Sequence, residues 1–133
     1  MMKRHPMKTW LILSYIGLAS CASYQRSDLY FGRDIPGGGQ VSEQEWKAFS
    51  DSVISHYFPE GYTEWEAKGR WKDTKTGETI TEPTKVVTFF GKAGKQRSNA
   101  IDSIAQQYLR RFRQQSVLRS DMRSGVHFLN QTP

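Results

Sequence analysis

The chain has 133 residues, of which 37% are hydrophobic and 24% charged, and its formal net charge is +6. This length suits one domain with a single hydrophobic core and is too short for two. Lys3, Arg4 and Lys8 supply three of the 19 basic residues, so the chain after residue 20 has 16 bases against 13 acids. This small excess, without a basic stripe interleaved with aromatic side chains, argues against nucleic acid as a partner.

The N-terminal segment has the organisation of an export signal. A basic head precedes the apolar run Thr9–Ala19, which is shorter than the roughly 20 residues that a transmembrane helix needs. Leu18-Ala19-Ser20-Cys21 resembles the lipobox of bacterial lipoproteins, in which the cysteine thiol carries a diacylglyceryl group. An ordinary secretory signal cleaved after Ala22 is the alternative, and the shortness of the run argues against a permanent membrane anchor.

The lipobox interpretation divides the chain into parts. We expect a signal peptide over 1–20, a lipidated Cys21 with a flexible tether over 21–27, one domain over 28–129 and a tail over 130–133. Because Cys21 is the only cysteine, no internal disulfide is possible, and acylation accounts for the single thiol. Acyl chains on Cys21 would attach the protein to a membrane. Ala22 is not the aspartate associated with inner-membrane retention, so the resemblance implies the outer membrane, with the domain facing the periplasm.

The first half of the expected domain contains a strand and a helix. Asp28–Gly32 is rich in β-formers and stops at a glycine, and Pro36–Gly39 is a loop. Ser42 and Glu45 form a capping box, which predicts the start of a helix. Pro59 ends this helix. Its apolar residues have helical spacing: Trp46, Phe49, Val53, Ile54 and Tyr57.

A β-hairpin is predicted next. Residues 63–72 alternate, so that Trp65 and Trp71 share one face, which we expect to lie in the core with Trp46. Residues 73–78 have the composition of a turn, and a return strand follows them. The backbone nitrogen of Pro83 cannot donate a hydrogen bond, so its segment is predicted to be an edge, a bulge or the start of the strand.

A second helix and a final strand complete the pattern. The helix is predicted from Ser98 or Asn99 to Phe112, because these apolar residues recur at helical spacing: Ile101, Ile104, Ala105, Tyr108, Leu109 and Phe112. Residues 116–129 are predicted to form a last strand or a bent pair. Its expected core residues are Val117, Leu118, Val126 and Phe128.

The order strand, helix, strand, strand, helix, strand predicts the fold class. With right-handed crossovers, it forms an α+β ferredoxin-like βαββαβ sandwich, a four-stranded antiparallel sheet with two helices on one face. Tyr30, Val86 and Phe90 would add apolar surface to the opposite face of that sheet. Many sheets of this type cover that face by pairing, so we expect a homodimer.

Several segments of the domain resemble a domain-of-unknown-function family of small secreted bacterial proteins. They lie in the expected order over roughly 28–129, and they are Leu29-Tyr30-Phe31-Gly32, Val41-Ser42-Glu43-Gln44-Glu45-Trp46, Gly69-Arg70-Trp71, Glu82-Pro83-Thr84-Lys85 and Gln115-Ser116-Val117-Leu118-Arg119. The resemblance implies an export address and a fold. It implies no activity, substrate or catalytic residue.

Candidate ligand-binding residues are Arg33, Glu82, Lys85 and Arg119, charged groups at predicted strand ends or loops where a sheet can gather them. Such a group would suit a small anionic ligand, while the alternative is that opposite charges merely tie strand ends together, each pair contributing under about 1 kcal/mol. We therefore predict a noncatalytic binding or interaction module. The alternative is a small enzyme of the dimeric α/β-barrel kind, using Arg33, His56, Lys85 or Arg119 and distinguished by at least two of them in one deep cavity.

The sequence gives little support for a metal or a cofactor. His56 and His127 lie in distant elements without a cysteine or an acidic cluster at ligand spacing, so no metal site is predicted. The loop Gly37-Gly38-Gly39 lacks the Lys-Ser/Thr of a P-loop and the spaced glycines of a dinucleotide site, so no cofactor is predicted.

Overall fold

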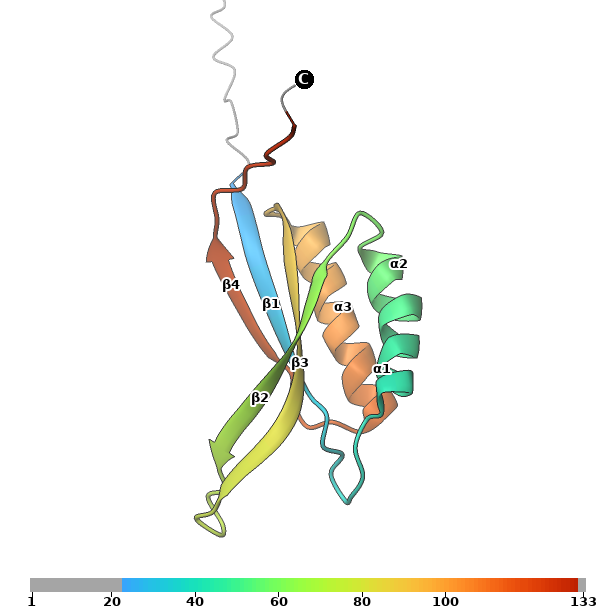
Figure 1. Cartoon of the computed structure of the whole chain (residues 1–133), viewed down its shortest axis with the longest axis vertical. Coiled ribbons are helices and arrows are strands. Elements are labelled where there is room, and N and C mark those ends of the chain that lie inside the picture. The colour runs from blue at the N-terminus through green and yellow to red at the C-terminus, as the bar shows by residue number, and fades with distance from the viewer. Residues whose placement is uncertain (1–22, 132–133) are drawn as a thin grey trace, which may run out of the picture.

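The computed structural model describes residues 23–131 and has an α+β fold (Figure 1). The elements are β1 (Tyr24–Gly32), α1 (Glu43–Phe49), the π-helical η1 (Ser50–Ile54), α2 (Ser55–Tyr57), β2 (Thr63–Lys72), β3 (Thr79–Lys92), α3 (Lys95–Phe112) and β4 (Leu118–Arg123). The strands form one antiparallel sheet in the order β2-β3-β1-β4. The continuous segment α1–η1–α2 and helix α3 cover one face of it. This confirms the predicted ferredoxin-like sandwich.

The predicted signal peptide and Cys21 lie outside the described residues. Within residues 23–131, no helix is long and apolar enough to cross a membrane.

The first helical segment begins where the sequence predicts. The Ser42 hydroxyl accepts a hydrogen bond from the Glu45 amide, and the Glu45 carboxylate accepts one from the Ser42 amide, which completes the capping box. From Ser50 the helix widens into a π-helical turn before it ends at Tyr57. Single π-turns within α-helices occur frequently at functional sites.

The core lies between the two helical segments and the covered face of the sheet, and aromatic rings dominate it. Phe31 of β1 packs against Trp46 and Tyr108, with ring centroids 5.2 and 4.8 Å apart. Phe49 lies 5.3 Å from Tyr108 and 5.9 Å from Phe112. The Tyr108 hydroxyl donates to the Gly32 carbonyl at 2.9 Å, so this buried tyrosine satisfies its polar group. The helical stripes predicted from the sequence therefore do form the core.

Two elements begin earlier than predicted. β1 starts at Tyr24, so residues 24–27, expected in the flexible tether, belong to the sheet. Their polar side chains conceal the strand in the sequence, but pairing with both β3 and β4 satisfies their backbone groups. Helix α3 starts at Lys95 because the Ser98 amide already donates to the Gly94 carbonyl, a regular helical bond at 3.0 Å.

The prediction that Trp65 and Trp71 lie in the core is wrong. Their indoles are 44% and 50% exposed, on the sheet face away from the helices. The strand alternates as predicted, but the two faces are reversed: Glu64 and Glu66 point toward the helix side, where they bond the side chains of other elements. β2 is an edge strand, so its helix-side residues reach solvent at the border of the sandwich.

The predicted last strand is shorter in the structure. β4 ends at Arg123, and its first residue Leu118 points to the uncovered face and is 63% exposed. Val117, just before the strand, packs against the core as predicted. Phe128 is exposed rather than buried, since residues 124–131 leave the sheet.

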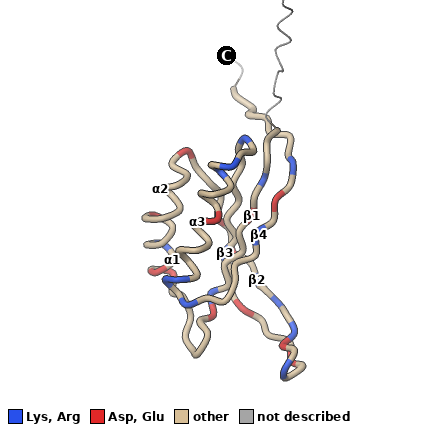
Figure 2. Tube along the Cα trace, turned by 180° about the vertical axis from the view of Figure 1, so that it is seen from behind, with Lys and Arg blue, Asp and Glu red and all other residues tan. Residues whose placement is uncertain are grey.

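Strands β2 and β3 continue beyond the rest of the sheet as a two-stranded arm. The register of β1 with β3 ends at Gly32 opposite Thr84, so residues 68–83 have no third strand beside them (Figure 1), and the Arg33 amide donates to the Pro83 carbonyl at 3.0 Å where this stretch begins. Pro83 lies at the base of this arm, where it has no amide proton to donate, and the Arg33 carbonyl accepts from the Val41 amide at 2.8 Å. The arm projects from the end of the molecule opposite the start of β1 (Figures 1 and 2).

Candidate functional site

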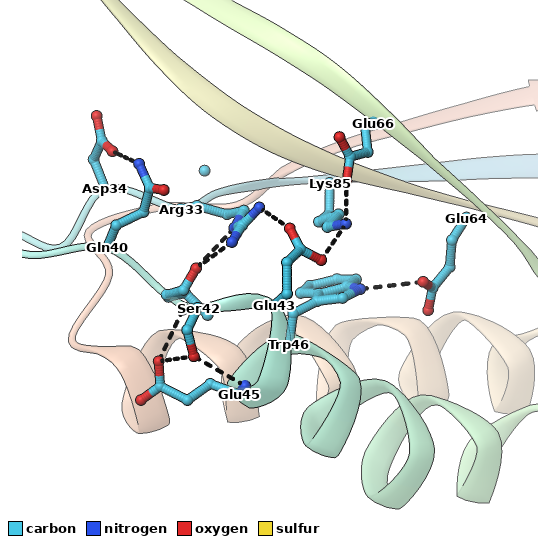
Figure 3. Close-up of polar contacts among 12 residues, drawn as sticks. Arg33, Asp34, Gln40, Ser42, Glu43, Glu45, Trp46, Glu64, Glu66 and Lys85 are labelled. Carbon is cyan, nitrogen blue, oxygen red and sulfur yellow. Dashed lines mark hydrogen bonds and ion pairs between the residues drawn. The ribbon is translucent and has the colours of Figure 1, made fainter.

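A cluster of charged groups on the helix side joins β1, β3 and α1 (Figure 3). The Arg33 and Lys85 side chains are each only 9% exposed, and both form ion pairs with Glu43 at the start of α1. The Lys85 ammonium donates to Glu43 at 2.9 Å and to Glu66 at 2.6 Å. Arg33 also donates to the Val41 carbonyl, from Nε at 2.8 Å and from Nη2 at 2.6 Å. Two nearly buried cations are thus compensated by two carboxylates that remain open to water.

The protonation equilibria of this cluster favour its charged form. The hydrogen bond from Lys85 lowers the pKa of Glu43 below its ordinary value, and the charge of Arg33 adds to this effect. Burial lowers the pKa of Lys85, but its hydrogen bonds to Glu66 and Glu43 outweigh that cost, so its pKa lies above the usual value. At neutral pH Glu43 and Lys85 are therefore both ionised.

A hydroxyl-rich group adjoins the cluster along the π-helical turn. Glu64 accepts hydrogen bonds from the Trp46 indole at 3.1 Å and from the Ser50 hydroxyl. The Tyr62 hydroxyl lies 2.8 Å from both Ser50 Oγ and Ser55 Oγ. The widened turn carries Ser50 at its start and is followed by Ser55, so both hydroxyls reach the same tyrosine.

A surface cavity of about 570 Å³ lies over these groups. Its lining residues are Glu43, Trp46, Lys47, Ser50, Asp51, Tyr62, Glu64 and Lys85. Arg33, His56 and Arg119 are not among them. The cavity that His56 lines lies elsewhere, between α2, the end of β3 and the start of α3. Each of these two cavities therefore contains one of the four residues considered for an enzyme, Lys85 in the first and His56 in the second.

The four candidate ligand-binding residues do not form a single site. Arg33 and Lys85 meet through Glu43. Glu82 lies on the opposite face of the sheet, and its carboxylate packs against Gly32. The contact is so close that a Cβ atom added at Gly32 would lie 2.8 Å from the Glu82 carboxylate. Burial raises the pKa of Glu82, and nearby Asp34 raises it further.

Arg119 lies beside α3, on the helix side of β4. It donates to the Asp102 carboxylate at 2.6 Å, to Asp121 at 2.9 Å and to the Ser98 carbonyl at 3.2 Å. These contacts tie the outer strand to the helix. Arg119 therefore has its own set of partners and shares none of them with Arg33 or Lys85.

The uncovered face of the sheet carries five of the seven large exposed apolar side chains of the described residues. Strand register arranges it in rows that cross the sheet. One apolar row crosses all four strands and consists of Trp65, Val86, Tyr30 and Leu118. A polar row follows, with Thr63, Thr88, Asp28 and Ser120, and then a third row with Phe90, Arg26 and Met122. Trp65, Trp71, Phe90, Leu118 and Met122 are each 44–63% exposed on this face.

A buried carboxylate lies at the centre of that face. Asp28 is almost inaccessible, and its carboxylate accepts hydrogen bonds from Thr88 Oγ1 at 2.7 Å and Arg26 Nε at 3.0 Å. The Trp65 indole lies 3.4 Å from the same threonine oxygen. The Arg26 guanidinium lies 6.0 Å from the centre of the Phe90 ring. These bonds satisfy the polar row within the monomer, so covering the face leaves no buried charge without a partner.

Asp28 and Glu43 were not singled out by the sequence. Asp28 stands at the start of the predicted strand, and only the register shows that both neighbouring strands enclose it. Glu43 directly follows the N-cap residue. An acid at this position is already explained by its favourable interaction with the helix dipole, so the sequence gives no sign of a further role. Within residues 23–131, no group of three or more histidine, cysteine, aspartate or glutamate side chains is arranged to hold a metal ion.

Two solved structures share this fold. A phage SAM lyase in complex with S-methyl-5'-thioadenosine has a TM-score of 0.59 and 10% sequence identity, over 77% of this chain and 82% of that one. The same enzyme in its apo state has a TM-score of 0.58 and 11% identity, with the same coverage. At this identity the likeness establishes the fold alone. No curated protein sequence matches the chain.

The sequence also matches a family model over residues 26–128, described as a protein of unknown function (DUF3574). This range includes every strand and helix of the structure except the first two residues of β1. It confirms the resemblance to a domain-of-unknown-function family. The chain therefore belongs to the DUF3574 family.

Proposed function

We propose that this protein is a noncatalytic interaction module, exported and held at a membrane by acyl chains on Cys21, that pairs with a second copy through its uncovered sheet face. The observation that carries the proposal is the gathering of five large, half-exposed apolar side chains on that face. A patch of this kind marks an interaction surface in soluble domains.

The row pattern favours a second copy as the partner. Two sheets that pack face to face can be related by a twofold symmetry axis in either of two directions. If the axis runs parallel to the strands, each row lies opposite its own copy. If the axis runs across the strands along the polar row, the two rows on either side of the polar row lie opposite each other. In both arrangements apolar rows meet rows with apolar side chains, and the polar row containing Asp28 meets its own copy. The face is therefore complementary to itself.

The dimensions of the face also suit a dimer. Four strands about 4.8 Å apart and a central strand of nine residues at about 3.3 Å each give a flat area of roughly 570 Å². The accessible surface of such a pleated face, with its side chains, is larger than this flat area. The face is therefore of the size needed for a stable interface, which buries about 800 Å² on each partner.

We expect the chain from Ala22 onward to sediment as a dimer, and Trp65→Glu to make it a monomer. A charge at the β2 end of the first apolar row would be buried without a partner in the dimer, whereas Trp65 is already half exposed in the monomer. Sedimentation equilibrium of both proteins measures this. Phe128→Glu is the matched control, because Phe128 is an exposed aromatic residue outside the sheet face. A monomeric wild type at all concentrations would contradict the self-association.

We expect Cys21→Ser to abolish membrane attachment of the full chain, because the serine hydroxyl does not accept the diacylglyceryl group. The membrane fraction of cells that express each protein, with mass spectrometry of the mature N-terminus, measures this. The wild type should carry a mass increase that corresponds to acylation. An unmodified wild-type N-terminus, or unchanged membrane retention of the variant, would refute the lipid anchor.

The alternative function is a small enzyme that uses the cavity lined by Lys85. A nearly buried ammonium group at the wall of a cavity supports this alternative. Against it, the ammonium already binds two carboxylates, and the cavity holds no second cation from the set considered. The phage SAM lyase contributes only its fold to the comparison, so it does not favour catalysis here.

A further inference from the structure

We propose that the end of the domain where β1 begins is a contact surface for anionic lipid headgroups. The surface, called here the entry surface, consists of Lys92 at the end of β3, Lys95 at the start of α3 and Arg123 at the end of β4. The inference rests on the proposed lipid anchor for the orientation of the domain. The binding of headgroups by this surface, however, can be tested on a protein that lacks Cys21 and its acyl chains.

Strand register brings these cations around the first residue of β1. Tyr24 pairs with Lys92, and its neighbour Gln25 pairs with Arg123. The Ala93 amide donates to the Ser23 carbonyl at 2.9 Å, and the Ser124 amide donates to the Tyr24 carbonyl at 3.0 Å. The ends of β3 and β4 are therefore fixed on either side of the point where the chain enters the sheet.

The three cations are exposed and carry charge that no described acid neutralises. Lys92, Lys95 and Arg123 are all exposed and none forms an ion pair within residues 23–131. The first turn of α3 contains no acid, although acids are favoured at that positive end of a helix. Glu60 is the acid that shares a cavity with Lys92. Figure 2 shows Lys and Arg positions gathered at this end of the molecule.

The length of chain before β1 identifies the partner. Three residue steps separate Cys21 from Tyr24, and they span at most about 11 Å. An acylated Cys21 therefore holds Tyr24 within about 11 Å of the headgroups even with the chain fully extended, a distance comparable to the roughly 8 Å screening length of surface charge at physiological salt. Membrane anchors can combine an acyl chain with a polybasic patch. The entry surface supplies the second of these.

The test uses the chain from Ala22 onward, which lacks Cys21 but contains all the described elements and the core. It is mixed with vesicles of phosphatidylcholine alone and with vesicles that also contain phosphatidylglycerol, and the bound fraction is measured by sedimentation. We expect binding only to the phosphatidylglycerol vesicles. Each cation near such a surface strengthens binding about fivefold, so K92E/K95E/R123E should weaken it by about 100-fold or more.

A matched control lies at the other end of the molecule. Lys68, Arg70 and Lys72 are exposed on one face of the arm, opposite the uncharged residues Pro83, Thr81 and Thr79. The variant K68E/R70E/K72E changes the net charge by the same amount, and it should bind within about twofold of the wild type if the entry surface is the contact.

Three outcomes would overturn the inference. They are no preference of the wild type for phosphatidylglycerol vesicles, equal losses in the two triple variants, and full competition by soluble glycerol phosphate, which would indicate a free anion as the ligand. Failure of the lipid anchor is recognised separately, from an unmodified Cys21 in the mass spectrum of the full chain. The two proposals can therefore fail independently.

Discussion

Replacing Phe49 by alanine is expected to lower the free energy of unfolding by about 3 to 5 kcal/mol. The Phe49 side chain is fully buried, and its ring lies 6.2 Å or less from those of Phe31, Trp46, Tyr108 and Phe112. The four remaining rings are held by β1 and by both helical segments, so they cannot collapse into the cavity without moving an element. Because small domains have only about 5–15 kcal/mol of stability, this loss is a large fraction of the total.

Urea denaturation of the chain from Ala22 onward, followed by circular dichroism, measures the effect. Phe128→Ala is the matched control, since the same ring is removed from a side chain that is 81% exposed. Its expected change is within about 0.5 kcal/mol. Similar losses in the two variants would show that Phe49 does not lie in the core described here.

The contrast between Phe49 and Trp65 shows what the sequence can predict. A helical stripe has one apolar side, and that side must face the core, so the spacing of Trp46 and Phe49 predicts their burial directly. Strand alternation divides residues 63–72 into two faces equally well, but it does not say which face meets the helices. The choice depends on tertiary partners: Glu64 and Glu66 find hydrogen-bond donors on the helix side, and Trp65 joins an apolar row on the other.

Strand alternation and strand pairing explain part of the candidate site, whereas one of its residues follows from neither. Glu82 and Lys85 are three residues apart in one strand, so period-two alternation alone places them on opposite faces. The meeting of Arg33 with Lys85 follows from pairing, since Phe31 lies opposite Lys85 and Arg33 lies two residues further along. Glu43 is different, because no local pattern shows that the first turn of a helix reaches two cations on the sheet.

The rows of the uncovered face depend on the register of all three strand pairs. Tyr30, Val86 and Phe90 were expected there, and the structure confirms that they share the face. The sequence did not predict Leu118 and Trp65 as the ends of one row with Tyr30 and Val86, because register depends on loop lengths and on the other strands. The proposed pairing of two copies rests on this row.

Glu43→Gln is expected to lower the free energy of unfolding by about 1–3 kcal/mol at neutral pH. The substitution removes the negative charge shared by Arg33 and Lys85, whose side chains are each only 9% exposed. Glu43 itself is 62% exposed, so water screens the pair and the loss stays below that of a fully buried ion pair. Asp51→Asn is the matched control, because it breaks the exposed Lys47–Asp51 pair, which water screens, and it should change the free energy of unfolding much less than Glu43→Gln does.

The pH dependence of this difference tests its electrostatic origin. The pKa of Glu43 is lower in the folded state than its ordinary value of 4.5, so the carboxylate stabilises the fold above that pH. The contribution is lost as the pH falls through the depressed folded-state pKa, because both states then bind the proton. Urea denaturation of the wild type and Glu43→Gln should therefore give a constant difference from neutral pH down to about 5.5, and a shrinking one below about 4.5. A difference that stays the same in acid would mean that the variant acts through lost packing at the start of α1, and that the two cations do not depend on Glu43 for their charge balance.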